Sequence, residues 1–377
     1  MKLFKKYFPA LLFISSFLLM IKVILNNGYP DFSNFYFGPL LAFKNINPYL
    51  GNVNLFTPTT YPPFIFWFLY PLTLLPLVIA EKLWTIGSII ALFLSISLLL
   101  KIFNQKITSS ESLILFSLAF LAFPVKFTLG MGQINIFILL FITLFIYFLN
   151  KSKAYSGLFL ALCLMLKVFP LAPIFYLITA KKWKTIAYLF LTLILGITLT
   201  LIFIRTAVVV YFIEKIVPTL LNSWKGDYYN QSLTGVMVRA GIYDNRELIR
   251  SVITLIIALP VFWIVFLNKS KEKLTINLII GTLLTLNLLI NSFSWQHHFV
   301  WLLPSFFVTY LYLKKIKADK YFYYLLFFCY LLVSLNLKNP LDLPLLAQSH
   351  VFFGTLILLI FQTTLLYNST KIKSLKI

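Results

Sequence analysis

The sequence predicts an all-α, polytopic integral membrane protein that forms a single transmembrane domain over residues 1–377. Composition is the first reason, because 60% of the 377 residues are hydrophobic and only 11% are charged, whereas soluble domains carry about 25% charged residues. The second reason is that lysines gather in small clusters between apolar stretches, as membrane-insertion signals do. These observations exclude a cytosolic enzyme, a disordered chain and a secreted disulfide scaffold.

The basic excess, 32 Lys and Arg against 10 Asp and Glu, does not indicate a nucleic-acid-binding protein, since it forms no single patch. Membrane lipids are the expected surroundings instead. The two cysteines, Cys163 and Cys329, lie within apolar runs. They are expected to be small core residues without a disulfide or a metal site.

The lysine clusters divide the chain into about 12 expected transmembrane helices. Cytoplasmic flanks carry the excess of lysine, so seven clusters, from Lys2 to Lys376, require six excursions across the membrane. Both termini are then cytoplasmic, and the apolar run after Lys6 is expected to be a retained first helix. The expected spans are 8–27, 78–102, 111–124, 134–150, 155–167, 170–180, 185–204, 249–267, 274–292, 299–313, 320–336 and 350–368.

Two stretches fit this topology in an unusual way. Residues 155–180 are short for two full spans, which predicts two short helices meeting at Lys167-Val168-Phe169-Pro170 or one re-entrant hairpin. Residues 64–76 are also apolar, but counting them as a span would place Lys101 and Lys106 outside the cell. We therefore expect residues 64–76 to lie at the outer interface, where their aromatic side chains suit the environment.

Two long loops, about 28–77 and 205–248, are expected on the extracytoplasmic side, with juxtamembrane helices. All four arginines lie in or beside the second loop, at positions 205, 239, 246 and 250. Arginine suits planar, bidentate recognition of phosphate. Their position therefore favours a phosphate-binding outer face.

Asp31 is the first candidate for a catalytic residue. It follows the first expected helix and lies among aromatic residues near the membrane surface. A carboxylate that nearby lysine or arginine holds ionised can accept a proton from a sugar hydroxyl. The alternative is a loop aspartate that caps a short helix, and the residues alone leave both roles open.

Short motifs follow one another in order between about residues 28 and 304. They are Asp31-Phe32 with Tyr36, Asn47-Pro48-Tyr49, Tyr61-Pro62-Pro63, Gly132-Gln133-Ile134-Asn135, Gly157 through Lys167-Val168-Phe169-Pro170, Asn230-Gln231-Ser232-Leu233 with Arg239, and Ser294-Trp295-Gln296-His297-His298. Together they resemble glycosyltransferase family 87, a group of polyprenol-phosphate-mannose-dependent enzymes in the GT-C superfamily.

The resemblance implies a GT-C-type fold in the cell inner (plasma) membrane and a hexosyltransferase activity. Such an enzyme moves a hexose, with mannose the expected sugar, from a polyprenyl-phosphate donor to a hydroxyl of a glycolipid or glycan acceptor. Transfer takes place at the extracytoplasmic face with inversion at the anomeric carbon. Asp31 occupies the position of the family's general base, and no cofactor is implied beyond the donor substrate.

The leaving polyprenyl phosphate is an anion, so cations or hydrogen-bond donors are expected near it. Lys167 is costly in an apolar helix unless it is paired or faces a cavity; the alternative is a lysine that snorkels to the interface. Arg239 is expected to clamp phosphate or else to be a solvated loop charge. The motifs add Tyr61 and Gln231 as expected substrate contacts.

His297 and His298 are further expected substrate contacts at the outer end of a span. Adjacent residues of a helix point about 100° apart, so one is expected to face the ligand and the other to be structural. Gln133 and Asn135, at an outer helix start, either bind sugar hydroxyls or cap the helix. Asp31, Lys167, Arg239 and one of the histidines are expected to converge on one outward-facing cavity.

No tightly bound metal is expected. Residues 126–133 form the next extracytoplasmic loop after residues 28–77 in the expected topology, and they lack the acidic metal-binding motif that several GT-C enzymes carry there. Two other functions stay open from the residues: a transporter or flippase for a lipid-linked sugar, and a lipid-linked glycan ligase. The unequal outer loops and the scarcity of intramembrane charges disfavour a transporter. The early Asp31 and the Tyr61-Pro62-Pro63 motif favour a single-sugar transferase over a ligase.

Overall fold

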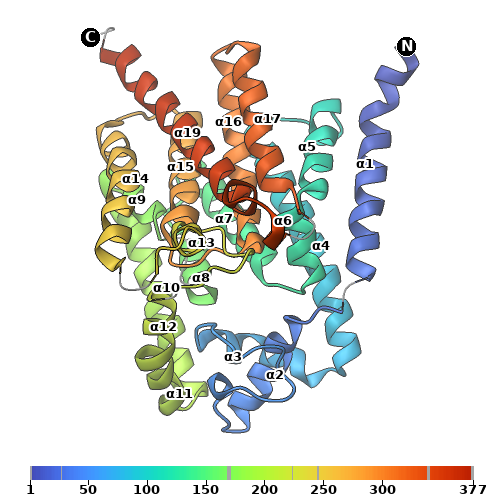
Figure 1. Cartoon of the computed structure of the whole chain (residues 1–377), viewed down its shortest axis with the longest axis vertical. Helices are drawn as coiled ribbons and strands as arrows, with labels where there is room; N and C mark the ends of the chain where they lie inside the picture. Colours follow the sequence, from blue (N-terminus) through green and yellow to red (C-terminus); the bar gives the residue numbers. More distant parts are fainter. Residues whose placement is uncertain are drawn as a thin grey trace. The chain divides into compact units, whose positions relative to one another are not determined.

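The chain divides into two compact units whose relative positions are not determined (Figure 1). Unit 1 comprises residues 1–121, 125–168 and 187–222, and unit 2 comprises residues 122–124, 169–186 and 223–377. The computed structural model describes residues 2–26, 28–167, 171–222, 224–243, 246–337 and 340–374. This part is helical, with one isolated antiparallel bridge between Asn230 and Trp295. The expected single domain over 1–377 stays a prediction.

Six helices in the described residues are long and apolar enough to cross a membrane, which confirms the membrane character. They are α1 (Lys2–Leu25), α4 (Leu77–Ile102), α10 (Trp183–Phe203), α14 (Glu247–Leu267), α15 (Lys273–Ile290) and α19 (His350–Ser374). The bent pair α5 (Ser110–Leu121) and α6 (Phe123–Gly130) adds a seventh if it counts as one span, with a bend of 57°. The twelve-span topology, the cytoplasmic termini and the outer loops stay predictions.

The remaining expected spans coincide with shorter helices. These are α7 (Asn135–Asn150), α8 (Ser156–Leu166), α9 (Pro173–Thr179), α16 (Leu303–Lys315) and α17 (Lys320–Ser334). An α-helix rises 1.5 Å per residue, so the 11 residues of α8 reach about 16 Å, roughly half of a hydrocarbon core of about 30 Å. Lys167 follows α8 directly, and residues 168–170 lie outside the described residues, so the choice between two short helices and a re-entrant hairpin stays open.

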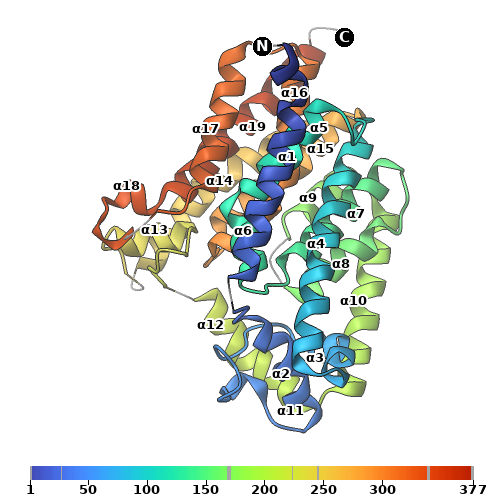
Figure 2. The same ribbon diagram turned by 90° about the vertical axis from the view of Figure 1, so that its right-hand side faces the viewer.

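In unit 1, α7 packs against both α4 and α8 (Figure 2), and α1 packs against α5. The α1–α5 contact is aromatic: the Phe13 ring centroid lies 5.9 Å from that of Phe116 and 5.7 Å from that of Phe120. Such ring pairs add to the free energy gained from burying apolar surface. Apolar packing therefore holds the helices around the short turns that carry the site described below.

The first expected loop is folded. It contains α2 (Phe32–Phe43), η1 (Pro48–Leu50), α3 (Phe64–Leu69) and η2 (Tyr70–Leu74). Helix α2 packs on α3 and η2, and the Tyr36 hydroxyl donates to the Leu75 carbonyl at 2.8 Å. Residues 64–74 form a short apolar helix, so a place at the outer interface stays a prediction.

The second expected loop is partly helical in unit 1, with α11 (Thr206–Tyr211), a π-helical turn η3 (Phe212–Ile216) and α12 (Val217–Leu221). Tyr49 of η1 stacks on Tyr211, with ring centroids 6.2 Å apart. It also lies 5.7 Å from the Phe212 ring. These contacts join the two expected loops within unit 1.

Helix α15 is central to unit 2, where it packs against α9, α14, α16 and α19 (Figure 1). In its most apolar stretch of 18 residues, 78% of the residues are buried, compared with 17% in that of α14. A Cβ at Gly281 would lie 3.2 Å from the Ser305 Cα of α16, and the Ser305 hydroxyl donates to the Gly281 carbonyl at 2.8 Å. Small residues thus allow close helix contact, as is common in membrane proteins. The unit also contains α13 (Leu233–Arg239), η5 (Gln296–Leu302), η6 (Pro340–Asp342) and α18 (Leu345–Gln348).

Candidate functional site

The Asp31 side chain forms a hydrogen bond within unit 1 in place of a helix cap. Asp31 directly precedes α2, but its carboxylate makes no capping hydrogen bond to that helix. Its Oδ2 atom instead accepts from the Gln133 Nε2 atom at 2.7 Å. The Asp31 residue is buried, with 9% of its surface exposed. Its Oδ1 atom forms no hydrogen bond in the described part of the chain, and a lone pair there is available to a substrate hydroxyl.

The turn at Gly132 fixes Gln133 relative to Asp31. The Asp31 backbone N–H donates to the Met131 carbonyl at 3.0 Å, and the Trp84 indole N–H donates to the Gly132 carbonyl at 2.9 Å. Gly132 has φ +70°, and a Cβ there would lie 2.9 Å from the Phe32 Cβ. Only glycine combines this backbone conformation with so close an approach.

Gln133 bridges Asp31 to Tyr61. Its side-chain oxygen accepts from the Tyr61 hydroxyl at 2.7 Å, while its nitrogen donates to Asp31. The Tyr61 backbone carbonyl in turn accepts from the Tyr49 hydroxyl at 2.7 Å. Because the tyrosine donates and the carboxylate accepts, the amide has one orientation that satisfies both partners. Gln133 therefore orients the Asp31 carboxylate.

Lys167 lies beside the same group. Its Nζ atom donates to the Asn135 Oδ1 atom at 3.3 Å and lies 5.3 Å from the centroid of the Tyr61 ring. Asn135 is the first residue of α7, and Lys167 is in an extended conformation just after α8. The packing of α7 on α8 thus places a buried ammonium group next to the tyrosine that contacts Gln133.

The electrostatics suit a buried base near a cation. Burial raises the pKa of Asp31, while the hydrogen bond from Gln133 and the charge of Lys167 oppose that rise. Burial also raises the pKa of Tyr61, so Tyr61 stays a donor to Gln133. A carboxylate with a raised pKa is a stronger base than an exposed one.

In unit 2, the two motif segments around Asn230 and Trp295 are docked together. The Gln231 N–H donates to the Ser294 carbonyl at 2.8 Å, and the Gln296 N–H donates to the Tyr229 carbonyl at 2.9 Å. The Asn230 side-chain oxygen also accepts from the Ser294 N–H at 3.0 Å. Asn230 and Ser294, which lie 64 positions apart in the sequence, therefore belong to one local structure.

Arg239 holds this loop in place. Its Nη1 atom donates to the carbonyls of Gly226, Asp227 and Asn230 at 3.3, 2.9 and 2.9 Å. The Nε and Nη2 atoms both contact the Ser349 hydroxyl, at 3.2 and 3.0 Å. All three guanidinium nitrogens thus donate within the protein, and phosphate binding by Arg239 stays a prediction.

Gln231 is also held by protein groups. Its Nε2 atom donates to the Tyr228 and Gln348 carbonyls at 2.5 and 2.8 Å, and its Oε1 atom accepts from the Phe352 N–H at 3.2 Å. The side chain is fully buried. These contacts indicate a structural role, and the expected substrate contact stays a prediction.

The two histidines differ in their surroundings. His298 is fully buried, accepts from the Trp295 N–H through its Nδ1 atom at 3.2 Å, and stacks on Trp301 with ring centroids 5.3 Å apart. His297 is 7% exposed and lies parallel to the Trp295 ring at 6.4 Å. The segment is a 3₁₀ helix in place of the expected α-helix. His298 has the structural position, which makes His297 the proposed ligand contact of the pair.

The structure therefore brings five of the predicted residues together in unit 1: Asp31, Tyr61, Gln133, Asn135 and Lys167. The other four, Gln231, Arg239, His297 and His298, lie in unit 2. Convergence of the two groups on one cavity stays a prediction.

Sequence reasoning did not identify Trp84, whose side chain holds the Gly132 turn, or Ser349, which contacts Arg239. Trp84 lies in an apolar span and Ser349 lies near the start of another. Neither belongs to a recognisable motif in the sequence.

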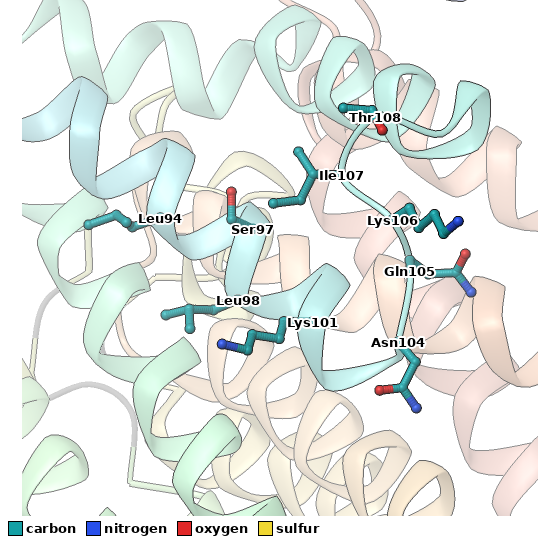
Figure 3. A pocket seen from close by; sticks show the side chains of 9 residues that line it. All are labelled: Leu94, Ser97, Leu98, Lys101, Asn104, Gln105, Lys106, Ile107 and Thr108. Carbon is teal, nitrogen blue, oxygen red and sulfur yellow. The ribbon is translucent and has the colours of Figure 1, made fainter.

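A pocket of about 720 Å³ lies at the C-terminal end of α4 and the loop that follows (Figure 3). Leu94, Leu98 and Ile107 form part of its lining, together with Lys101 and Lys106. None of the predicted site residues lines it. The side chains of Lys101 and Lys106 point in different directions in this view.

The sequence model described as glycosyltransferase family 87 matches residues 59–291. Two curated relatives carry the name polyprenol-phosphate-mannose-dependent alpha-(1-2)-phosphatidylinositol pentamannoside mannosyltransferase. The protein of Mycolicibacterium smegmatis is 25% identical over 66% of this chain and 60% of its own length. That of Mycobacterium tuberculosis is 23% identical over 66% of this chain and 57% of its own length.

The chain thus spans about 60% of the length of the curated relatives it matches. No solved structure matches it significantly. The family match extends from just before Tyr61 to the end of α15 and includes Gln133, Asn135 and Lys167. Since it covers more than half of the chain, the protein belongs to glycosyltransferase family 87.

Proposed function

We propose that this protein is a membrane glycosyltransferase that moves a hexose, with mannose the expected sugar, from a polyprenyl-phosphate donor to an acceptor hydroxyl. The observation that carries the proposal is the buried Asp31 carboxylate, which Gln133 orients and which lies near the Lys167 ammonium. Family membership and the names of the two mannosyltransferase relatives support the choice of reaction and donor. The acceptor is a glycolipid or a glycan, and transfer takes place on the extracytoplasmic face of the plasma membrane.

In this mechanism Asp31 is the general base. Its Oδ1 atom takes the proton of the acceptor hydroxyl as that oxygen attacks the anomeric carbon of the donor. The bond between the anomeric carbon and the phosphate oxygen breaks, so the polyprenyl phosphate leaves with the bonding electrons. Attack opposite to the leaving group inverts the configuration at the anomeric carbon.

Lys167 would stabilise the negative charge of the leaving phosphate. A buried ammonium group interacts strongly with an anion because the low-dielectric surroundings screen it poorly. His297 and Arg239 stay proposed phosphate or acceptor contacts from unit 2. The reaction needs no resident metal in this proposal, because Asp31 takes the proton directly and Lys167 supplies the positive charge.

Sugar transfer by the purified full chain tests the proposal. Radiolabelled polyprenyl-phosphate-mannose and extracted host lipids are supplied to the wild type, to Asp31→Asn and to the control Asp342→Asn, an exposed aspartate of η6. Transfer by the wild type and the control that falls by about 10²- to 10⁴-fold in Asp31→Asn is expected for loss of a general base. Undiminished transfer by Asp31→Asn would move the base to another residue, and no transfer by the wild type from any polyprenyl-phosphate hexose would exclude the proposed donor class.

A further inference from the structure

Buried polar atoms without partners gather in one short segment of unit 2. In the described part of the chain, the Asn291 Nδ2, Ser294 Oγ, Gln296 Nε2 and Gln296 Oε1 atoms are buried and form no hydrogen bond. Ser294 and Gln296 have no exposed surface at all. Buried polar groups in folded proteins are nearly always paired, so such a concentration requires an explanation.

The backbone of the same segment is well paired. The Ser294 N–H donates to the Asn230 side chain, the Ser294 carbonyl accepts from the Gln231 N–H, and the Gln296 N–H donates to the Tyr229 carbonyl. The fold therefore fixes the backbone that carries the two unpaired side chains.

We propose that Ser294 and Gln296 form a binding site for the hydroxyl groups of a hexose, an inference that rests on the proposed function. The side-chain amide of Gln296 offers donors at one end and an acceptor at the other, and the Ser294 hydroxyl offers both. A sugar hydroxyl also donates and accepts, so it satisfies this set. A phosphate oxygen only accepts and would leave the Gln296 Oε1 atom unpaired.

The cost of the unpaired atoms supports a binding role over a structural one. A structural glutamine is expected to pair within the fold, as Gln231 does at both ends of its amide. An unpaired buried amide destabilises the folded state, and an apolar side chain of similar shape would remove that cost. Hydroxyl groups of a ligand would pair the amide and favour the bound state. The site would also discriminate against sugar analogues that lack the hydroxyl.

The test compares Gln296→Met with Gln362→Met in the full chain, in nanodiscs or a detergent without a sugar head group. Gln362 is a fully buried glutamine of α19 whose Nε2 atom donates to the Thr309 hydroxyl at 2.9 Å, while its Oε1 atom has no partner in the described residues. Its replacement therefore breaks an existing hydrogen bond, whereas that of Gln296 breaks none. Thermal unfolding is measured with and without methyl α-mannoside at tens of millimolar. The KM values for the polyprenyl-phosphate-mannose donor and for the lipid acceptor are measured separately.

Gln296→Met is expected to unfold at the same or a higher temperature than the wild type, to lose the stabilisation by methyl α-mannoside, and to raise one KM at least tenfold. The KM that rises tells whether the donor sugar or an acceptor sugar binds there. Gln362→Met is expected to lower the unfolding temperature and to keep both the mannoside effect and the KM values. Ser294→Ala is expected to change the same KM as Gln296→Met, by a smaller factor.

An unchanged mannoside effect and unchanged KM values in Gln296→Met would overturn the inference. A lower unfolding temperature with unchanged KM values would overturn it as well and would indicate ordered water as the partner of Gln296. A failure of the proposed function can be distinguished from a failure of this inference. If the wild type transfers no sugar but its mannoside stabilisation depends on Gln296, the binding site stands and the reaction must be replaced.

Discussion

The side-chain amide of Gln133 and the carboxylate of Asp31 are joined by a 2.7 Å hydrogen bond, although the two residues lie 102 positions apart in the sequence. The bond links the turn before α2 to the turn before α7. It gives Gln133 a positioning role that sequence reasoning, which expected a sugar contact or a helix cap, did not predict. Tyr61 fixes the other end of the amide.

Gln133→Met is expected to move the acid limb of the pH profile of kcat/KM to higher pH. The Gln133 hydrogen bond favours the ionised form of Asp31 and lowers its pKa, against the larger effect of burial. Without that bond the pKa rises further, and since the base must be deprotonated, activity is lost at a higher pH as the solution is acidified. Gln362→Met is the control. A limb that stays in place in Gln133→Met would show that Gln133 does not act through Asp31.

Gly132→Ala is expected to lower the free energy of unfolding by about 1–2 kcal/mol, the usual cost of a left-handed conformation for a residue with a Cβ, and also to lower kcat. The contact with Phe32 forces the turn to shift, and with it Gln133. Gly87→Ala is the matched control, because a Cβ there would meet the Phe137 ring at an ordinary 3.4 Å in helix α4. Thermal or denaturant unfolding of both variants measures the difference. Equal stability of the two variants would contradict this account of the turn.

Arg239→Lys is expected to lower the free energy of unfolding by about 1–3 kcal/mol, because one ammonium group cannot satisfy the carbonyls and the hydroxyl that the guanidinium contacts. Arg246→Lys, at an exposed position before α14, is expected to leave stability unchanged. Unfolding temperature and the KM for the donor are measured in parallel. An Arg239→Lys variant with normal stability and a raised KM for the donor would favour the phosphate clamp over the loop-holding role.

Reporter fusions after Lys106 and after Lys153 are both expected to report the cytoplasm. Each site follows a cluster of lysines, which cytoplasmic flanks prefer. Fusions placed after Asn52, in the first expected outer loop, serve as the external reference. An external signal at Lys106 would make residues 64–76 a true span and would reverse every later loop.

The helical membrane character could be predicted from the sequence because it depends on composition and on the length of apolar runs. The motifs supplied Asp31 as the candidate base and Tyr61, Gln133, Asn135 and Lys167 as candidate substrate contacts, and all five lie in unit 1. The direction of each side chain could not be predicted. Whether Gln133 faces a ligand or Asp31 depends on tertiary contacts, above all on the turn that Gly132 and Trp84 hold.

Arg239 shows the same limit in unit 2. An arginine in an expected outer loop indicates a free cation. The Arg239 guanidinium instead donates hydrogen bonds to backbone carbonyls that only folding brings next to it. Helix ends were a further limit, since the apolar run of the expected span 111–124 continues through the break between α5 and α6. Hydropathy detects such runs but not the points at which the backbone leaves the helix.

Helix α15 has a consequence for how the protein is made. It has the lowest mean hydropathy of the six long helices, 1.7, a value it shares with α19. It is also the most buried of the six and carries polar side chains, such as Asn277 and Asn287, that neighbouring helices cover. A translocon that partitions helices one by one gains little from α15 alone. Its stable insertion is therefore expected to be delayed until α16 and α19 have been synthesised.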